Sequence, residues 1–478
     1  MEGLWHSHCA ILVLSFLLGS LDCSSQHVRN TESYIREASK RQDAQVPAPM
    51  TPRKTDPQLH VASHFAAPQC TAEPQNRFDC WPESNNTERA DCVKRGCCWD
   101  EDVVTKTNFT SPACFFPENY DGYQLVSLSP VERAGLLYGY NGTLRRTSSS
   151  PYPADVKELR LLVFFETETR IRFKIFDPNS ERYEVPMNLP PKWKTAFGDT
   201  QYTVTFADSP FGIGIYRKFT SEPLFDSRGM APLIFADQFL QIGTKLTTSY
   251  LYGFGEHRGP FLQDVHWRKL IFWTRDQYPI ENMNLYGSHP FYLNLEPSGN
   301  AHGVFLLNSN AMQVNIQPYD KSAGAGLTFL STGGILDFFI FTGPTPDEVV
   351  QQYTSLIGKP FMPPLWALGF HMCKHGYGNS SEFYKVIQRN RAARMPYDVQ
   401  WNDLDYSAGN KDWTWDNKTY VGLPEIIKDL HAHGQRNVII VDPGISSTQP
   451  PGTYPPYDLG LKMGVFLKNK DGTPLIGK

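Results

Sequence analysis

The sequence lacks the excess of positive charge that is typical of proteins that bind nucleic acids. Its 478 residues include 45 Lys and Arg against 49 Asp and Glu, which gives a formal net charge of −4. Nucleic acids and anionic membranes are bound largely through clustered positive charge, and no basic stripe stands out along the chain. We therefore expect neither as a partner. Hydrophobic residues make up 40% of the chain, so large cores can be buried.

Beyond its N-terminal region, the sequence also lacks any apolar run near the roughly 20 residues that a membrane-spanning helix needs. The apolar run Cys9–Gly19 has about the length of a signal-peptide core, although no Lys or Arg precedes it. We interpret residues 1–24 as a signal peptide, with a short membrane anchor as the alternative. Residues 25–68 are polar and without periodicity, which predicts a pro-segment or linker.

Sequons support the secretory interpretation. Five asparagines lie in N-x-[ST] triplets, namely Asn85, Asn108, Asn141, Asn379 and Asn417. A single triplet of this kind often arises by chance. Five of them, together with the signal-like start and the cysteine pattern, indicate a glycosylated luminal or secreted protein.

Cysteine is scarce except in one short region. Six of the nine cysteines fall between residues 70 and 114, namely Cys70, Cys80, Cys92, Cys97, Cys98 and Cys114. An even number in so short a stretch predicts a disulfide framework, because a small module cannot bury enough apolar surface alone. Cys97 and Cys98 are expected to bond to different partners, and the spacing leaves the rest of the pairing open. A zinc site is the alternative, but the stretch has neither a paired C-x-x-C motif nor a histidine. Cys373 is expected to be a buried core thiol.

Residues 119–355 have the pattern of β-strands. In "RIRFKIFD" apolar residues at 171, 173 and 175 alternate with basic residues at 170, 172 and 174, which predicts a half-buried antiparallel strand. Similar short runs recur at "QYTVTF", "GIGIYRK", "KLIFW", "HGVFLL" and "ILDFFIF". Because turn residues separate these runs, we predict a β-sandwich.

Residues 356–478 instead predict alternating strands and helices. We expect strands at "LWALGFHM" (365–372), "YDVQWNDLDY" and "NVIIVDPGIS", with helices at 380–394 and from Leu423 to Gly434 between them. This alternation is typical of the first units of a parallel (β/α)8 barrel. A closed barrel needs eight strands, so we predict a truncated barrel that holds three βα units.

The stretch "VQWNDLDYSAGNKDWTWDN" (399–417) holds four aspartates and three tryptophans. Asp403 and Asp405 lie at the carboxyl end of the second predicted strand, where barrel enzymes place their working residues. Glycoside hydrolysis needs carboxyl groups that flank the scissile bond from different directions, and neighbours on one strand cannot do this. For Asp403 we predict recognition of sugar hydroxyls beside an apolar tryptophan face, with a bracing role in the loop and core tryptophans as the alternative. For Asp405 recognition and a structural bridge both stay open.

The cysteine-rich stretch, with its "RGCCW" and "CFFP" motifs, resembles a P-type trefoil domain over residues 69–118. The resemblance implies three disulfides, namely Cys70–Cys98, Cys80–Cys97 and Cys92–Cys114.

Several longer segments are similar to glycoside hydrolase family 31, namely "PPLWALGFHMCKHGYG", "RAARMPYDVQWNDLDY", "GLPEIIKDLHAHGQRNVIIVDPGIS", "LYGFGEH" and "WTRD". The resemblance spans residues 69–478 and favours the lysosomal members. It implies a retaining, exo-acting α-glucosidase that removes terminal glucose from α-1,4 and α-1,6 oligosaccharides and glycogen, without a metal or organic cofactor. It also implies a lysosomal location, with secretion as the alternative.

The resemblance assigns roles to individual residues. It implies that Asp403 binds hydroxyls of the terminal glucose and that Asp276 reaches into the pocket from the β-sandwich. Leu404 and Ile440 match apolar pocket walls. His375 stands where the family usually has tryptophan, so affinity or specificity is expected to differ.

One family motif is missing from these residues. The family's nucleophile lies in a W-[IL]-D-M-N-E motif, which residues 1–478 do not contain, and its acid/base aspartate lies later still. We therefore expect no catalytic residue in this chain and no hydrolysis by it alone. The alternative is a noncatalytic secreted module in which the trefoil and the β-sandwich bind carbohydrate or a partner.

Overall fold

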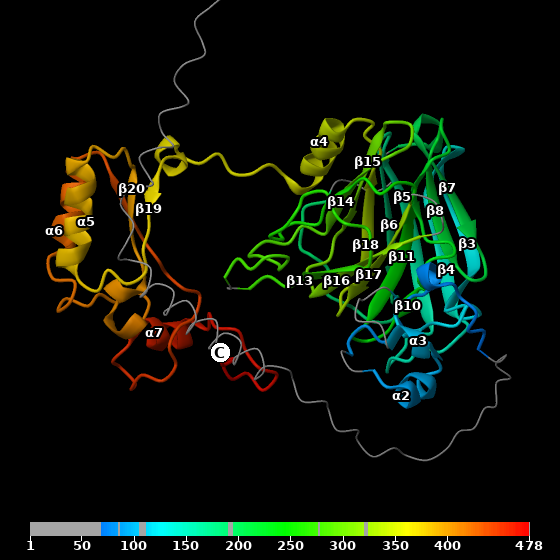
Figure 1. Ribbon diagram of the computed structural model, residues 1–478, viewed down its shortest axis with the longest axis horizontal. Helices are drawn as coiled ribbons and strands as arrows, with labels where there is room; N and C mark the ends of the chain where they lie inside the picture. Colours follow the sequence, from blue (N-terminus) through cyan, green and yellow to red (C-terminus); the bar gives the residue numbers. More distant parts are fainter. Residues whose placement is uncertain are drawn as a thin grey trace, which may run out of the picture. The chain divides into compact units, whose positions relative to one another are not determined.

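The computed structural model describes residues 68–84, 87–104, 111–189, 195–275, 278–319 and 324–477 (Figure 1). The predicted signal peptide, the predicted linker up to residue 67, the sequons at Asn85 and Asn108, and Asp276 lie outside these residues. Within the described ranges no helix combines the length and the apolar character that crossing a membrane requires.

The cysteine-rich segment forms a small module held by three disulfides. Its elements are η1 (Pro74–Asn76), α2 (Arg89–Lys94), β1 (Cys98–Trp99), α3 (Glu101–Val104) and β2 (Cys114–Phe115). The disulfides are Cys70–Cys98, Cys80–Cys97 and Cys92–Cys114, which is the pairing that the trefoil resemblance implies. The sulfurs of Cys92, Cys97 and Cys114 lie within 4.8 Å of one another, but each is in a disulfide and offers no thiolate to a metal.

The side chain of Arg95 joins this trefoil module to the β-sheet domain. The Arg95 guanidinium carbon lies 4.4 Å from the Trp81 ring centroid and 5.1 Å from that of Tyr152. Glu83 accepts hydrogen bonds from Arg95 at 3.2 Å and from the Tyr152 hydroxyl at 2.9 Å. Tyr152 also stacks on Phe239, with ring centroids 3.7 Å apart. These contacts fix the trefoil against the sheets.

The β-sheet domain contains one large antiparallel sheet of eight strands, with the order β12-β14-β15-β18-β6-β5-β4-β3 (Figure 1). These strands are β3 (Tyr123–Arg133), β4 (Leu136–Arg146), β5 (Glu158–Thr167), β6 (Arg170–Phe176), β12 (Leu251–Gly253), β14 (Phe291–Leu295), β15 (Ala301–Leu306) and β18 (Leu336–Phe341).

Two smaller antiparallel sheets complete this domain. A five-stranded sheet has the order β10-β11-β17-β16-β13, and a three-stranded sheet has the order β7-β8-β9. Their strands are β7 (Tyr202–Ala207), β8 (Gly212–Arg217), β9 (Pro223–Asp226), β10 (Ile234–Phe235), β11 (Leu240–Leu246), β13 (Arg268–Phe272), β16 (Met312–Pro318) and β17 (Ala325–Ser331), and η2 (Phe197–Asp199) precedes β7. All three sheets contribute to one hydrophobic core, as the alternation of apolar residues predicts for a sandwich.

Strand β6 differs from its prediction, because both of its faces are buried. Its three basic side chains are only 7%, 1% and 6% exposed. Arg172 donates two hydrogen bonds of 2.7 Å to Asp337, and Arg170 donates one of 2.8 Å to Glu166. The apolar cluster that includes α4 (Pro346–Ile357) covers part of this side of the sheet. The charges are therefore neutralised within the protein and do not face water.

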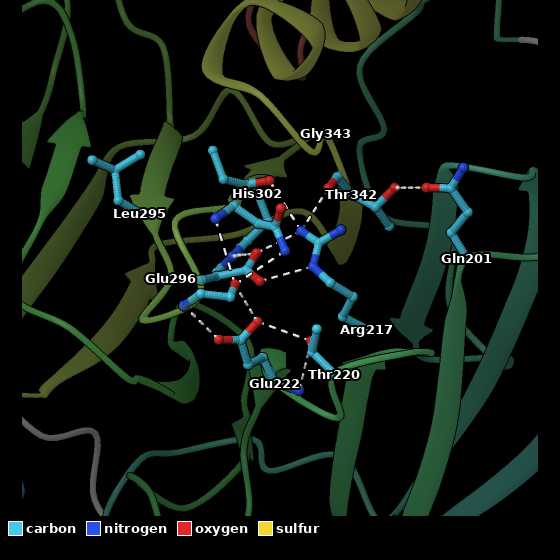
Figure 2. Close-up of polar contacts among 12 residues, drawn as sticks. Gln201, Arg217, Thr220, Glu222, Leu295, Glu296, His302, Thr342 and Gly343 are labelled. Atoms are coloured by element: carbon cyan, nitrogen blue, oxygen red, sulfur yellow. Dashed lines mark hydrogen bonds and ion pairs between the residues drawn. The ribbon is translucent and has the colours of Figure 1, made fainter.

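A second buried ion cluster joins three strands (Figure 2). Arg217, at the end of β8, donates hydrogen bonds of 2.8 and 2.6 Å to the two carboxylate oxygens of Glu296. It also donates to the carbonyl oxygens of Ala301 and Thr342. His302 Nδ1 lies 3.0 Å from Glu296. Burial opposes ionisation of Glu296, but the hydrogen bonds from Arg217 and His302 outweigh it and lower the pKa of Glu296 to about 2.

The remaining residues form a parallel sheet with helices. Its strands lie in the order β19-β20-β21 and are all parallel. The elements are η3 (Leu365–Leu368), β19 (His371–Met372), α5 (Ser380–Ala392), β20 (Val399–Asn402), η4 (Leu404–Tyr406), η5 (Ala408–Asn410), α6 (Leu423–Ala432), β21 (Arg436–Ile439) and α7 (Pro455–Met463). The sheet is open, and its three strands follow the βαβ succession that the sequence predicts.

The first strand of this segment is shorter than predicted. Residues 365–368 form a 3-10 turn, and only His371 and Met372 pair with β20. Leu365 and Leu368 are 86% and 67% exposed, so the prediction of a buried strand over 365–372 is wrong. Pro364 precedes the turn, and the backbone nitrogen of Gly369 donates to the carbonyl oxygen of Trp366 at its end, so these residues bond locally and not to a neighbouring strand.

Candidate functional site

The candidate site is the edge at which the three parallel strands end. Residues after β19, β20 and β21 lie at the same edge, because parallel strands share their direction. Three sequence-predicted residues or runs follow these strands, namely His375, Asp403 with Leu404, and Ile440. The structure thus brings together the predicted residues of the α/β segment at one edge.

Asp403 is half-buried at the end of β20 and caps η4. Its Oδ1 atom accepts a 2.7 Å hydrogen bond from the backbone nitrogen of Leu404. Its Oδ2 atom takes part in no hydrogen bond within the described part of the chain. A carboxylate with one anchored and one unused oxygen is oriented by the loop and can still accept hydrogen bonds from a ligand's hydroxyl groups.

The Asp405 carboxylate is hydrogen-bonded within the protein. Its Oδ2 atom accepts hydrogen bonds from the hydroxyl of Tyr420 and, at 3.1 Å, from the backbone nitrogen of Gly378. Tyr420 is 1% exposed, and burial together with the Asp405 carboxylate raises the pKa of its hydroxyl well above the ordinary value. Asp405 therefore joins the loop after β19 to the segment before α6, which is the structural bridge that the sequence left open.

The three tryptophans of this region have different surroundings. Trp401 Nε1 donates to His371 Nδ1 at 2.9 Å, which joins β20 to β19. Trp415 Nε1 donates to the carbonyl oxygen of Tyr420 at 3.0 Å. Trp413 is 67% exposed and has a positive φ of 59°. None of the three is a fully buried core residue, so apolar ring faces remain available near this edge.

Leu404 and Ile440 are both half-buried beside Asp403. The hydroxyl of Tyr406 donates to the carbonyl oxygen of Ile440 at 3.0 Å, which ties the loop after β20 to the end of β21. The Asp442 backbone nitrogen donates to Asp412 at 3.0 Å. These bonds hold the loop after β20 against the end of β21.

The loop after β19 exposes its side chains. His375 and Cys373 are exposed, so the prediction that Cys373 is a buried core thiol is wrong. The thiol's residual burial and the nearby Asp403 carboxylate raise the pKa of Cys373, which keeps it protonated and unreactive at neutral pH. Lys374 lies over the Tyr377 ring, with its ammonium nitrogen 5.6 Å from the centroid.

Three predicted sequons fall on described residues. Asn417 is exposed, and Asn141 and Asn379 are half-buried. The Asn379 side chain accepts a 2.9 Å hydrogen bond from the backbone nitrogen of Glu382 and so caps α5.

Three family models match the chain. Residues 70–117 match the trefoil (P-type) domain, residues 162–315 the N-terminal galactose mutarotase-like domain of glycosyl hydrolase family 31, and residues 360–478 the TIM-barrel domain of the same family.

Curated relatives match most of this chain but less than half of their own length. Lysosomal alpha-glucosidase of Rattus norvegicus is 45% identical over 427 residues, which is 88% of this chain and 43% of the relative. Intestinal sucrase-isomaltase of Oryctolagus cuniculus is 40% identical over 409 residues, which is 84% of this chain and 22% of the relative. The identity is thus higher to the lysosomal protein.

Solved structures share the fold. A glucosidase II alpha subunit aligns over 80% of this chain and 48% of its own, with a TM-score of 0.62 and 20% identity. A family-31 dextranase of Flavobacterium johnsoniae aligns over 69% of this chain and 39% of its own, with a TM-score of 0.52 and 21% identity.

Two groups of polar residues in the β-sheet domain were not predicted from the sequence. The Arg217, Glu296 and His302 cluster joins residues that are 79 and 85 positions from Arg217 along the chain, so no local pattern marks it. A hollow beside Trp273 and Asn310 likewise unites separate segments. The sequence feature that could have indicated this hollow was Trp273, the exposed aromatic residue that ends the predicted strand "KLIFW".

Proposed function

The chain belongs to glycoside hydrolase family 31, and we propose that it supplies the glucose-recognising part of a retaining, exo-acting α-glucosidase. The reaction releases terminal glucose from α-1,4- and α-1,6-linked oligosaccharides and from glycogen. The observation that carries the proposal is Asp403, a half-buried carboxylate at the carboxyl end of β20 with one oxygen open to a ligand. The 45% identity to rat lysosomal alpha-glucosidase supports it.

Each of the predicted substrate-binding residues has a proposed role. Asp403 accepts hydrogen bonds from hydroxyl groups of the terminal glucose. Leu404 and Ile440 pack against the less polar face of the ring. Asp276 contacts the sugar from the β-sheet domain. His375 borders the site with an imidazole, which offers hydrogen bonds where a larger aromatic ring would offer apolar contact and thereby alters sugar preference.

The 478-residue chain alone does not hydrolyse glycosides in this proposal. Retaining hydrolysis needs two carboxyl groups about 5 Å apart that flank the scissile bond from different directions. Asp403 and Asp405 come from one strand end, and Asp405 is already bound by Tyr420 and Gly378. The nucleophile motif is not among these residues.

The test compares this chain with a chimera in which the matching C-terminal part of rat lysosomal alpha-glucosidase follows residue 478. Glucose release from maltose and from a fluorogenic α-glucoside is measured at pH 4.5 and pH 7. The chimera is expected to be active and the 478-residue chain inactive. In the chimera, Asp403→Asn is expected to lower kcat/KM at least about a hundredfold, because the lost hydrogen bonds are charged ones that strengthen in the transition state.

Val421→Ala is the matched control, since Val421 lies between the same loop and α6, is 65% exposed and has no proposed role. An active 478-residue chain would overturn the assignment of the chemistry. An Asp403→Asn chimera with unchanged kcat/KM would remove Asp403 from the site.

A noncatalytic carbohydrate-binding module is the second candidate. The observation in its favour is that the buried clusters of the trefoil and the β-sheet domain include no residue of the α/β segment among the described residues. Glucan binding by the chain together with an inactive chimera would favour this candidate.

The proposed domain limits and location follow from the same relatives. We assign residues 1–24 to a signal peptide, 25–68 to a pro-segment or linker, 69–118 to the trefoil, 119–355 to the β-sandwich and 356–478 to the start of the barrel. The three disulfides and the lysosomal relatives support entry into the secretory pathway and a lysosomal destination. Secretion is the alternative.

A further inference from the structure

A hollow of about 350 Å³ lies at one end of the five-stranded sheet, where β13 ends and β16 begins. Its floor includes Phe272 and Met312, which are paired across the two strands and are 2% and 5% exposed. The volume is at the lower end of the range for small-molecule sites, roughly 300–1,000 Å³. All of its lining residues belong to the β-sheet domain.

Trp273 contributes an aromatic wall. Its side chain is 57% exposed although it directly follows a buried strand residue. Asn284 donates a hydrogen bond to its carbonyl oxygen, and the Arg275 guanidinium lies 5.1 Å from its ring centroid. The Asn284 bond anchors the backbone of Trp273, and the Arg275 guanidinium packs beside the indole without burying it. An exposed aromatic ring beside a hollow is typical of a ligand contact.

An amide pair forms the opposite, polar side. Asn308 is 7% exposed and donates to the carbonyl oxygens of Gly333 at 2.9 Å and Ile335 at 3.0 Å. Its own oxygen accepts bonds of 2.8 and 2.9 Å from the backbone and side-chain nitrogens of Asn310. Asn310 is therefore fixed through its nitrogen, and its Oδ1 atom takes part in no hydrogen bond among the described residues.

Two hydroxyl groups complete the rim. Thr274 Oγ1 and Ser288 Oγ lie 2.8 Å apart, and a hydrogen bond between them uses only one of their two protons. None of the nine lining residues carries a charge at neutral pH. The lining offers no acidic partner for an ammonium ligand, and the Arg275 guanidinium beside Trp273 is not part of the lining. A neutral ring with several hydroxyl groups and a less polar face matches the indole, the amide and the hydroxyls.

We propose that this hollow is a sugar subsite that binds one pyranose unit of an α-glucan chain in addition to the unit held at Asp403. The proposal rests on the proposed function for its choice of α-glucan as the sugar. Asn310 and the hydroxyl pair bind the ring hydroxyls, and Trp273 packs against the ring.

The experiment titrates maltoheptaose against the 478-residue chain, expressed through the secretory pathway of a host cell, by saturation-transfer NMR. Trp273→Ala and Asn310→Ala are each expected to weaken binding about tenfold, the loss that corresponds to one aromatic or hydrogen-bond contact. Gly333→Ala is an indirect probe, because an added Cβ atom would lie 2.9 Å from Asn310 Oδ1 and displace the amide. Phe219→Ala is the matched control, since Phe219 is 86% exposed in the same domain and does not line the hollow.

Asp403→Asn, titrated in parallel, separates this inference from the proposed function. Weaker binding by the Trp273 and Asn310 variants, with the Phe219 variant unchanged, supports the subsite. If only Asp403→Asn weakens binding, the subsite is overturned and the proposed function stands. If Asp403→Asn binds like the parent while the hollow variants do not, the subsite stands and sugar recognition by Asp403 fails. A parent protein that binds no maltoheptaose overturns the subsite, and equal binding of cellohexaose overturns its α-glucan preference.

Discussion

Replacement of Glu296 by Gln is expected to destabilise the β-sheet domain in a strongly pH-dependent manner. The Glu296 side chain is fully buried, and its carboxylate receives both hydrogen bonds of the Arg217 fork and one from His302 (Figure 2). Gln has the same shape but no charge, so the substitution leaves the Arg217 guanidinium buried without a counter-ion.

Two independent estimates give the magnitude. The pKa of Glu296 falls from an ordinary value of 4.5 to about 2, which at about 1.4 kcal/mol per pKa unit corresponds to about 3 kcal/mol. Removal of one member of a buried ion pair typically costs about 3–5 kcal/mol. Because the folded-state pKa is lowered, the stabilisation is present above the unfolded-state pKa and is lost as the pH falls through the folded-state pKa. The loss of unfolding free energy in the variant should therefore be close to its full size at pH 7 and pH 5, about half that size at pH 3 and almost absent at pH 2.

Hydrogen exchange of peptides from β8 and β15 measures the local unfolding free energy at each pH, which avoids a two-state assumption for a multidomain chain. Glu132→Gln is the control, since Glu132 lies exposed on β3 of the same domain. If the variant lost the same amount of local unfolding free energy at pH 7 and at pH 3, the reasoning would be refuted. Such a result would show that the stabilisation does not depend on ionised Glu296.

Three further substitutions test other contacts. Arg95→Ala should make the trefoil module less resistant to limited proteolysis, because it removes the packing of the guanidinium on two rings, which is worth about 1 kcal/mol or more. Arg95→Lys should retain only part of that resistance. Tyr420→Phe should lower the melting temperature of the α/β segment, because the Oδ2 atom of Asp405 loses its hydroxyl donor and keeps only the Gly378 backbone nitrogen. The melting is followed by the fluorescence of the tryptophans in this segment. Thr345→Ala should raise hydrogen exchange at the start of α4 by the loss of a capping box, about 1 kcal/mol, while Thr354→Ala in the same helix should leave that end unchanged.

Strand positions were predictable where alternation and turns agreed. The run "QYTVTF" gave β7 and "GIGIYRK" gave β8, because period-2 alternation is a direct consequence of strand geometry. The same alternation misled for β6, since it shows which residues share a face but not whether the second face meets water. Burial of that face depends on acidic partners such as Asp337, which lies 165 positions away from Arg172.

The helices of the α/β segment were predictable from their end signals. Asn379 caps α5 with its side chain, and Pro424 in the first turn of α6 and Gly434 beyond its end frame the second helix. The apolar run at 365–372 was not predictable, because residues 365–368 close a 3-10 turn through local backbone hydrogen bonds directly after Pro364, which has no N–H for a strand ladder. Local backbone chemistry therefore prevailed over composition at that position.

The two aspartates of "WNDLDY" show how one strand end can serve two purposes. Their spacing of two residues excluded an acid and nucleophile pair, but it could not distinguish recognition from bracing. The distinction comes from residues that the motif does not contain. Tyr420 and the backbone of Gly378 occupy Asp405, whereas Asp403 is bound only by the next backbone nitrogen among the described residues. The Oδ2 atom of Asp405 is hydrogen-bonded and its Oδ1 atom is buried, so neither oxygen can meet a substrate. Asp403 keeps its Oδ2 atom unused among the described residues and can accept a hydrogen bond from a ligand. Since a glycosidic bond must be flanked from different directions, the role that we propose for Asp403 is one wall of a sugar site, and the reacting carboxyl groups of that site would come from other elements.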